Sequence, residues 1–234
     1  MSKLISIVTT FAVVLCLASC GGNSKSSVNV PTEFCDKLVK LAEGGNAEAQ
    51  YRLGLYYGEN AQSAQEGEKC VSLLQNSANQ DFAPAKIVLS RMYTKGMGVP
   101  QDDQMAKQLL AQGIQAAEKG EAITQLALAF YYEQTGHKDE YFRWLNLAVA
   151  QNYAPAQFEL GYKYIYGDGI SPDMLKGFDL VKSAAEQGFA SAQFGLGCLY
   201  ERGEGVKADL NEAMKWYRKA AEQGNRNAVE RLKP

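Results

Sequence analysis

The sequence has no excess of charge of either sign, because 24 lysines and arginines nearly balance 26 aspartates and glutamates. A protein that binds nucleic acid usually carries a cluster of basic residues for the phosphates, and no such cluster occurs here. The composition therefore argues against nucleic acid as a partner.

The sequence motifs of common catalytic and metal centres are also missing. It contains no Gly-x-Ser-x-Gly and no His-Glu-x-x-His, and its glycine-rich turns lack the Lys-Ser/Thr of a phosphate-binding loop. The one histidine, His137, has no cysteine or carboxylate pair at metal-ligand spacing. The neighbours Asp102 and Asp103 are explained by the start of a helix. We expect no catalytic set, no cofactor and no metal.

The N-terminus carries an apolar run from Leu4 to Ala18, which is too short for a settled membrane-spanning helix. The order of a lysine, an apolar stretch and small residues is that of a secretory signal. The end of this stretch, Leu-Ala-Ser followed by Cys20, resembles a bacterial lipobox, whose cysteine is acylated and becomes the first mature residue. A small-residue cleavage site without a cysteine would indicate an ordinary signal peptide. We therefore predict a lipoprotein signal peptide over residues 1–19, lipidation of Cys20 and a flexible polar tether over residues 20–30.

The residues after Cys20 indicate which membrane would hold the lipid anchor. In proteins of this kind, an aspartate directly after the cysteine often retains the protein at the inner membrane, and an acidic tract can direct it to the cell surface. Neither feature is present. The expected location is a lipid anchor in the outer membrane, with the protein facing the periplasm.

Three cysteines remain once Cys16 of the leader and the acylated Cys20 are set aside. An odd number of widely spaced cysteines is not a disulfide framework. Cys35 and Cys70 could pair across adjacent helices, or they could be small buried thiols. The sequence leaves both alternatives open.

The rest of the sequence repeats itself. The segment Gln-Tyr-Arg-Leu-Gly that begins at Gln50 returns in related form at Gln157 and Gln193, and each glutamine follows an alanine. The copies are about 36 residues apart, which is typical of solenoids built from helix pairs. We predict an all-α repeat domain over residues 31–234, with repeats at about 47–81, 83–120, 121–152, 154–188 and 190–224.

Each repeat has recurring positions that a pair of helices explains. A small residue, a leucine and a tyrosine recur at spacings of four, which places them on one stripe of a first helix, called the A helix below. The tyrosines of this stripe are Tyr57, Tyr93, Tyr132, Tyr164 and Tyr200. A column of small residues follows the leucine and would let a second helix, the B helix, approach closely: Gly54, Ser90, Ala129, Gly161 and Gly197.

Turn residues mark the ends of the predicted helices. Residue types that tolerate a left-handed backbone recur where each B helix should end: Gly45, Asp81, Gly120, Asn152, Gly188 and Gly224. In three repeats a Gly-x-Gly turn joins the A helix to the B helix, and an aspartate suited to a helix N-cap follows: Asp102, Asp173 and Asp209. The copy over 121–152 has a shorter turn, and the copy over 83–120 carries about three extra residues late in its B helix.

These residues together resemble the Sel-1-like repeat, a relative of the tetratricopeptide repeat. The segments that carry the likeness run from Tyr200 to Val206 and from Ala213 to Gly224. The likeness is strongest over 154–188 and 190–224 and weakest over 121–152. It implies a right-handed superhelical solenoid of antiparallel helix pairs that serves as an adaptor surface.

The face of each A helix opposite the core stripe is the candidate binding surface, since this face commonly lines the concave side of such solenoids. It mixes aromatic and basic residues, which are frequent anchors of binding interfaces. The candidate partner-binding residues are Arg52, Tyr56, Arg91, Lys95, Tyr131, Tyr162, Lys163, Tyr166 and Arg202. The alternative is that some of the tyrosines pack between adjacent A helices and belong to the core.

The sequence thus predicts a monomeric, membrane-anchored scaffold or adaptor of the bacterial cell envelope that binds a protein or peptide partner. An alternative is a binder of peptidoglycan fragments or other glycans, for which tyrosine platforms would also serve. An enzyme that acts on envelope polymers is disfavoured, because no nucleophile and base are paired.

Overall fold

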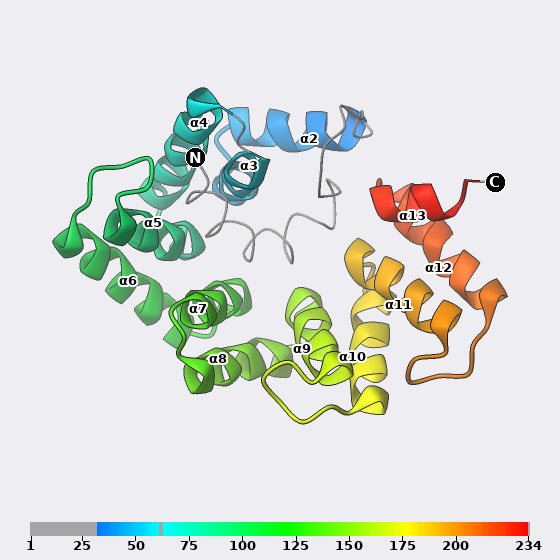
Figure 1. Cartoon of the computed structure of the whole chain (residues 1–234). Helices are drawn as coiled ribbons and strands as arrows, with labels where there is room; N and C mark the ends of the chain where they lie inside the picture. The colour runs from blue at the N-terminus through cyan, green and yellow to red at the C-terminus, as the bar shows by residue number, and fades with distance from the viewer. Residues whose placement is uncertain (1–31, 61–62, 234) are drawn as a thin grey trace. The chain divides into compact units, whose positions relative to one another are not determined.

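The computed structural model describes residues 32–60 and 63–233 (Figure 1). The predicted signal peptide, Cys20 and the tether lie outside the described residues. The described part of the chain is helical and contains α2 Thr32–Glu43, α3 Ala47–Asn60, α4 Ala64–Asn79, α5 Ala83–Lys95, α6 Asp103–Glu118, α7 Ala122–Gln134, α8 Lys138–Ala150, α9 Ala154–Tyr166, α10 Met174–Glu186, α11 Ala190–Arg202, α12 Leu210–Glu222 and α13 Arg226–Arg231.

The chain forms two compact units, one over residues 36–148 and one over residues 149–234. In the first unit α3 packs on α4 and α5 packs on α6, and α5 also contacts α7. In the second unit α9 packs on α10 and α11 packs on α12, with α13 against α12. The predicted fold class, an all-α solenoid of helix pairs, is confirmed.

The A helices are α3, α5, α7, α9 and α11, and their predicted core stripe is largely buried. The alanine or threonine and the leucine of each stripe are at most 8% exposed, whereas the tyrosine that ends each stripe is half-buried. The column of small residues lies where the A and B helices meet. A Cβ atom added at Gly161 would lie 3.0 Å from the carbonyl oxygen of Gly177 in α10, so the two backbones nearly touch.

The predicted left-handed residues all have positive φ. The values are 87° at Gly45, 66° at Asp81, 97° at Gly120, 58° at Asn152, 89° at Gly188 and 81° at Gly224. At Gly188 the chain closes with two backbone hydrogen bonds, from Gly188 N to the Ala185 carbonyl and from Phe189 N to the Ala184 carbonyl. This pairing ends the B helix and satisfies its last carbonyls.

The predicted caps and length differences are also confirmed. The side chains of Asp102, Asp173 and Asp209 each accept hydrogen bonds from backbone N–H groups in the first turn of α6, α10 and α12. Helix α6 has 16 residues, against 13 in α10 and in α12. Only residues 135–137 separate α7 from α8.

A buried glutamine near the start of each of several A helices links consecutive helix pairs. Gln193 Nε2 donates to the carbonyl oxygen of Ala185 at 3.3 Å, at the end of the preceding B helix. Gln193 Oε1 accepts a hydrogen bond of 2.7 Å from Gln223 Nε2, which follows its own B helix. We call this arrangement the glutamine clamp. It recurs at Gln50, which donates to Ala42 and accepts from Gln80.

The clamp varies in the other repeats. Gln125 donates to the carbonyl of Ala117. Gln157 donates to the side chain of Asn152 instead of a carbonyl, and it accepts from Gln187. The second repeat has Lys86 in the place of the glutamine, and its ammonium pairs with the carboxylate of Asp81. The second helix pair is therefore joined to the first by an ion pair rather than by neutral amides.

We predict that Gln193→Leu lowers the free energy of unfolding by about 2 kcal/mol, because it removes the two hydrogen bonds that Gln193 makes, one to the Ala185 carbonyl and one from the Gln223 amide. The measurement is urea unfolding followed by circular dichroism. Gln108→Leu, at an exposed position of α6, is the matched control and should change stability by less than about 0.5 kcal/mol. Equal losses of unfolding free energy from the two substitutions would show that the clamp does not stabilise the fold.

Candidate functional site

The nine candidate residues all lie on A helices, but much of the face that they share is not at the surface. On this face Leu55, Met92 and Phe130 are at most 1% exposed. The candidate surface is therefore partly buried between helices. The reason is that A helices such as α5 and α11 pack against helices of neighbouring pairs as well as against their own B helix. The candidate residues form separate groups.

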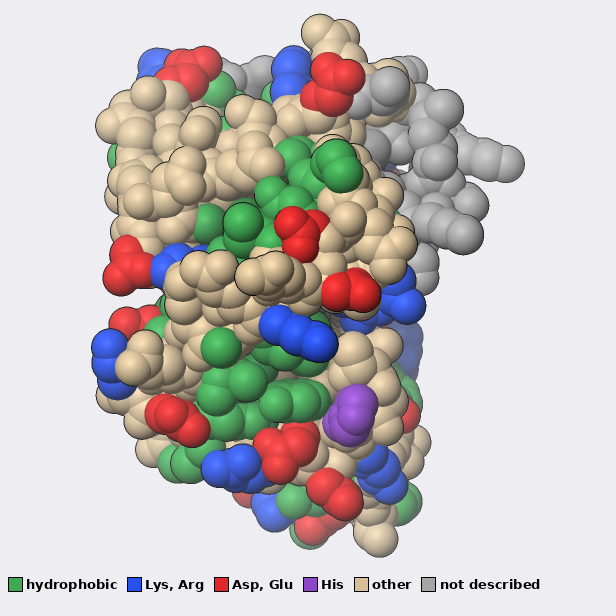
Figure 2. Space-filling view, turned by 90° about the vertical axis from the view of Figure 1, so that its left-hand side faces the viewer, with side chains coloured by type: hydrophobic (Ala, Val, Ile, Leu, Met, Phe, Trp, Pro, Cys, Tyr) green, Lys and Arg blue, Asp and Glu red, His purple; other side chains and the backbone are tan. Residues whose placement is uncertain are grey.

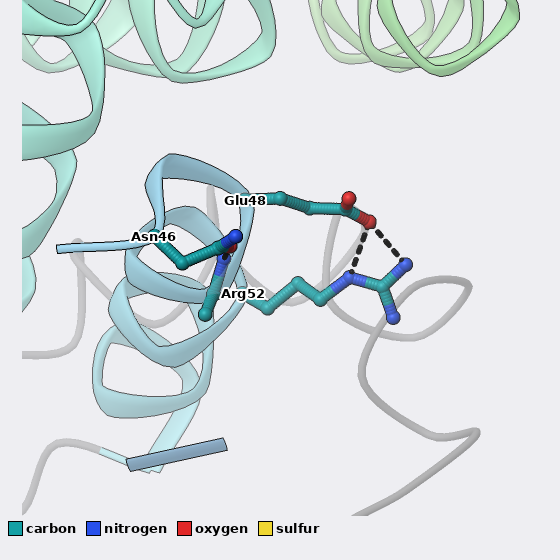
Figure 3. Close-up of polar contacts among 4 residues, drawn as sticks. Asn46, Glu48 and Arg52 are labelled. Carbon is teal, nitrogen blue, oxygen red and sulfur yellow. Dashed lines mark hydrogen bonds and ion pairs between the residues drawn. The ribbon is translucent and has the colours of Figure 1, made fainter. Parts of the chain in front are cut away.

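The first group, Arg52 and Tyr56, lies on α3. Arg52 reaches back one turn to Glu48, with Nη2 at 2.6 Å and Nε at 3.0 Å from Oε1 (Figure 3). The nearby Asn46 side chain accepts a hydrogen bond of 2.8 Å from Ala49 N and caps the helix. Tyr56 packs against the cluster of Ala42, Ala49 and Leu53. Both candidates thus have roles within the fold.

The second group joins α5 to α7 through Arg91 and Tyr131. The Nε and Nη1 atoms of Arg91 are buried and have no hydrogen-bond partner within the described residues. Burial raises the pKa of Tyr131, and the nearby guanidinium of Arg91 opposes this shift. Lys95, at the end of α5, is exposed.

The third group lies on α9 and α11, and its centre is Tyr162. The ring of Tyr162 is 4.7 Å from that of Phe158. A Cβ atom added at Gly195 of α11 would lie 2.7 Å from the Tyr162 hydroxyl. Burial raises the pKa of Tyr162 well above its usual range. This tyrosine packs between adjacent A helices, as the core alternative expects.

Tyr166 and Arg202 lie at the surface of this group. Tyr166 is 58% exposed, and its ring is 5.6 Å from that of Tyr162. The Arg202 side chain is 50% exposed and lies 3.7 Å from Glu204, whose carboxylate raises the pKa of Arg202. We call Tyr162, Tyr166 and Arg202 the Tyr166–Arg202 cluster. It combines a fixed inner ring, an exposed outer ring and a guanidinium.

Lys163 lies beside this cluster but is held by acidic neighbours. Its side chain is 12% exposed, and its ammonium lies 2.6 Å from Asp168 and 3.7 Å from Glu159. Glu204 is a residue that the sequence reasoning missed. It is the middle residue of a Gly-x-Gly turn, where only the glycines carried a sequence signal, and it follows Arg202 by two residues.

The cysteines and acidic residues of the described segments do not form a reactive centre. Within these segments no group of three or more His, Cys, Asp or Glu residues could hold a metal ion. Cys70 is a free, buried thiol, and burial raises its pKa to about 12, so it is protonated at neutral pH. Burial also raises the pKa of the free Cys198. The side chain of Cys35 is outside the described part.

None of the described helices has both the length and the apolar character that crossing a membrane requires.

Comparisons with known proteins agree with this architecture. A family model described as Sel1 repeat matches residues 47–82, 83–121, 154–189 and 190–225. The pair α7 and α8 falls between the second and third matches. A Sel1 repeat protein from Oxalobacter formigenes is 30% identical, with a TM-score of 0.52, over 86% of this chain and 59% of that one.

Two further solved structures are similar. A protective antigen of uropathogenic Escherichia coli with an SLR fold is 31% identical, with a TM-score of 0.53, over 88% of this chain and 43% of that one. An immunity protein from Pseudomonas aeruginosa is 25% identical, with a TM-score of 0.51, over 79% of this chain and 67% of that one. The chain thus spans less than two thirds of the length of the first two proteins.

We predict that Tyr162→Ala and Tyr166→Ala have very different effects on stability. Loss of the packed Tyr162 ring should lower the free energy of unfolding by about 3 kcal/mol. Loss of the exposed Tyr166 ring should change it by less than about 0.5 kcal/mol. Urea unfolding of the two variants measures both. A large loss from Tyr166→Ala would place that ring in the core and remove it as a docking residue.

Proposed function

Because the chain belongs to the Sel1 repeat family, whose members are generally protein-interaction scaffolds, we propose that it is an adaptor of the bacterial cell envelope. Its partner is a protein segment that docks on the Tyr166–Arg202 cluster. The observation that carries this proposal is the large exposed ring of Tyr166, which lies against the half-buried Tyr162 beside an arginine.

The cluster has the properties of a binding anchor. Tyrosine and arginine are enriched among the residues that dominate binding energy, since they join a large apolar area to directional polar groups. Tyr166 rests on a neighbour that α11 fixes in place, so ordering its ring on binding costs little conformational entropy. Arg202 can turn from Glu204 to a carboxylate of the partner.

The envelope location rests on the N-terminal sequence. Cys20 after Leu-Ala-Ser supplies the acylation site, and the polar tether that follows separates the anchor from the first helix. A multiply acylated cysteine anchors a protein durably, because each buried methylene adds about 0.8 kcal/mol. We place the anchor in the outer membrane, with the repeats in the periplasm.

We predict that a photo-cross-linking amino acid in place of Tyr166 forms a covalent adduct with the partner protein in living cells. The same amino acid in place of Lys182, on the exposed side of α10, is the matched control and should form none. Adding Arg202→Ala to the Tyr166 probe should weaken the adduct at least fivefold. Adduct formation is read by gel shift and mass spectrometry.

Two outcomes would contradict the proposed partner. Equal adducts from positions 166 and 182 would show that the cluster is not a docking site. An adduct that resists proteases but is cleaved by a peptidoglycan hydrolase would support the glycan-binding alternative, in which Tyr166 stacks on a sugar ring.

We predict that Cys20→Ala abolishes acylation and moves the protein out of the membrane fraction. Metabolic labelling with a fatty-acid analogue, followed by fractionation, measures both effects. Cys35→Ala is the control and should keep label and location. A labelled Cys20→Ala protein would refute the lipobox interpretation without affecting the docking cluster.

A further inference from the structure

A surface pocket of about 510 Å³ opens between α4, α5 and α6 of the first unit. Leu89 of α5 and Met105 and Leu109 of α6 form its apolar lining. On the side of the molecule where α6 lies in Figure 1, hydrophobic side chains reach the surface in patches between polar and charged ones (Figure 2). The volume is within the usual range of small-molecule pockets.

The unusual residue of this pocket is Lys86, which replaces the glutamine of the clamp. Lys86 is only 9% exposed, and a buried ammonium is costly unless it is paired. Its partner, Asp81, has a side chain that is 90% exposed, so the pair reaches from the interior to the mouth of the pocket. The other repeats have a neutral glutamine at this position, whereas the second repeat places the cation of Lys86 in the wall of the pocket.

The pocket is rich in hydrogen-bond donors. The Lys86 ammonium carries three N–H donors, of which Asp81 accepts one. Gln75, Asn79 and Gln112 add side-chain amides, and Tyr93 adds a hydroxyl. Within the described residues, these four side chains have no hydrogen-bond partner. Donors and amides thus converge on a space that the protein itself leaves unfilled.

The charge around the pocket favours an anion. Both Lys86 and the nearby Lys119 lower the pKa of Asp81, so two cations act on one carboxylate at this place. A second carboxylate, supplied by a ligand, would balance the local charge.

We propose that this pocket binds a small organic carboxylate whose body carries amide or hydroxyl groups, such as an acetamido sugar acid or an N-acylated amino acid. The ligand carboxylate accepts hydrogen bonds from Lys86, and the amides of Gln75 and Gln112 bind the polar body. The apolar side chains cover its methyl groups. This site is separate from the proposed docking cluster and does not depend on it.

The probes are two acids, each with a neutral counterpart: N-acetylmuramic acid with N-acetylglucosamine, and N-acetylalanine with N-acetylalanine amide. Binding to the full-length protein in detergent is measured by ligand-observed NMR titration. At least one acid should bind, and its neutral counterpart should bind at least tenfold more weakly. The acid that binds identifies the ligand as a sugar acid or an acylated amino acid.

Two variants should change binding in opposite directions. Lys86→Gln restores the residue of the other clamps, whose amide can donate to the Ala78 carbonyl, so the fold should persist while affinity for the acid falls at least tenfold. Asp81→Asn removes the competing carboxylate and should strengthen binding severalfold. Asparagine suits this backbone, because Asn152 holds the equivalent position with φ of 58°.

Lys95→Gln is the matched control, since it removes a lysine of α5 that does not line the pocket, and it should leave affinity unchanged. Thermal unfolding of each variant without ligand verifies that it is folded. Failure of both acids to bind, equal binding of acid and neutral probes, or equal losses from Lys86→Gln and Lys95→Gln would each overturn the proposal.

Discussion

The buried glutamine at the start of an A helix is the constraint on which the stacking of helix pairs depends. A primary amide removed from water must satisfy both its donors and its acceptor. The Gln193 side chain donates to the carbonyl of Ala185 in the preceding B helix and accepts from the amide of Gln223 just after its own B helix. One side chain thus links the ends of two consecutive B helices. Because both bonds need correct geometry, the clamp selects one register between consecutive pairs, whereas apolar contacts alone would tolerate sliding.

This close stacking also determines where the protein can offer side chains to a partner. The A helices are covered for most of their length, and residues such as Leu55 and Phe130 cannot vary without disturbing the core. The last turn is different. Tyr166 and Arg202 each end an A helix just before a turn glycine, and both reach the surface. The fold thus holds the helix body constant and leaves the helix ends for recognition.

The sequence predicted the features that depend on single residues or on short spacing. Asp81 and Asn152 predicted left-handed residues at helix ends, and Asp173 predicted an N-cap. The extra residues of the copy over 83–120 predicted a longer α6. The sequence could not distinguish Tyr162 from Tyr166, since a spacing of four residues places both on one face. Only the close approach of Gly195 in α11 covers part of the Tyr162 ring. The pocket was missed because Lys86 and Asp81 belong to different columns, and only the turn between them brings their charges together.

The chemistry of the clamp determines how the joints between helix pairs respond to pH. Neutral amides neither gain nor lose protons, so the joints at Gln50 and Gln193 are indifferent to pH across the range in which proteins stay folded. The joint at Lys86 alone, among the clamp positions described here, contains titrating groups. The pKa of Asp81 is lowered in the folded state, so its stabilising effect is present above the ordinary carboxyl pKa and fades as the pH falls through the folded value. Lowering the pH would therefore weaken the joint at Lys86 in the first unit before it weakened the joints made by glutamines.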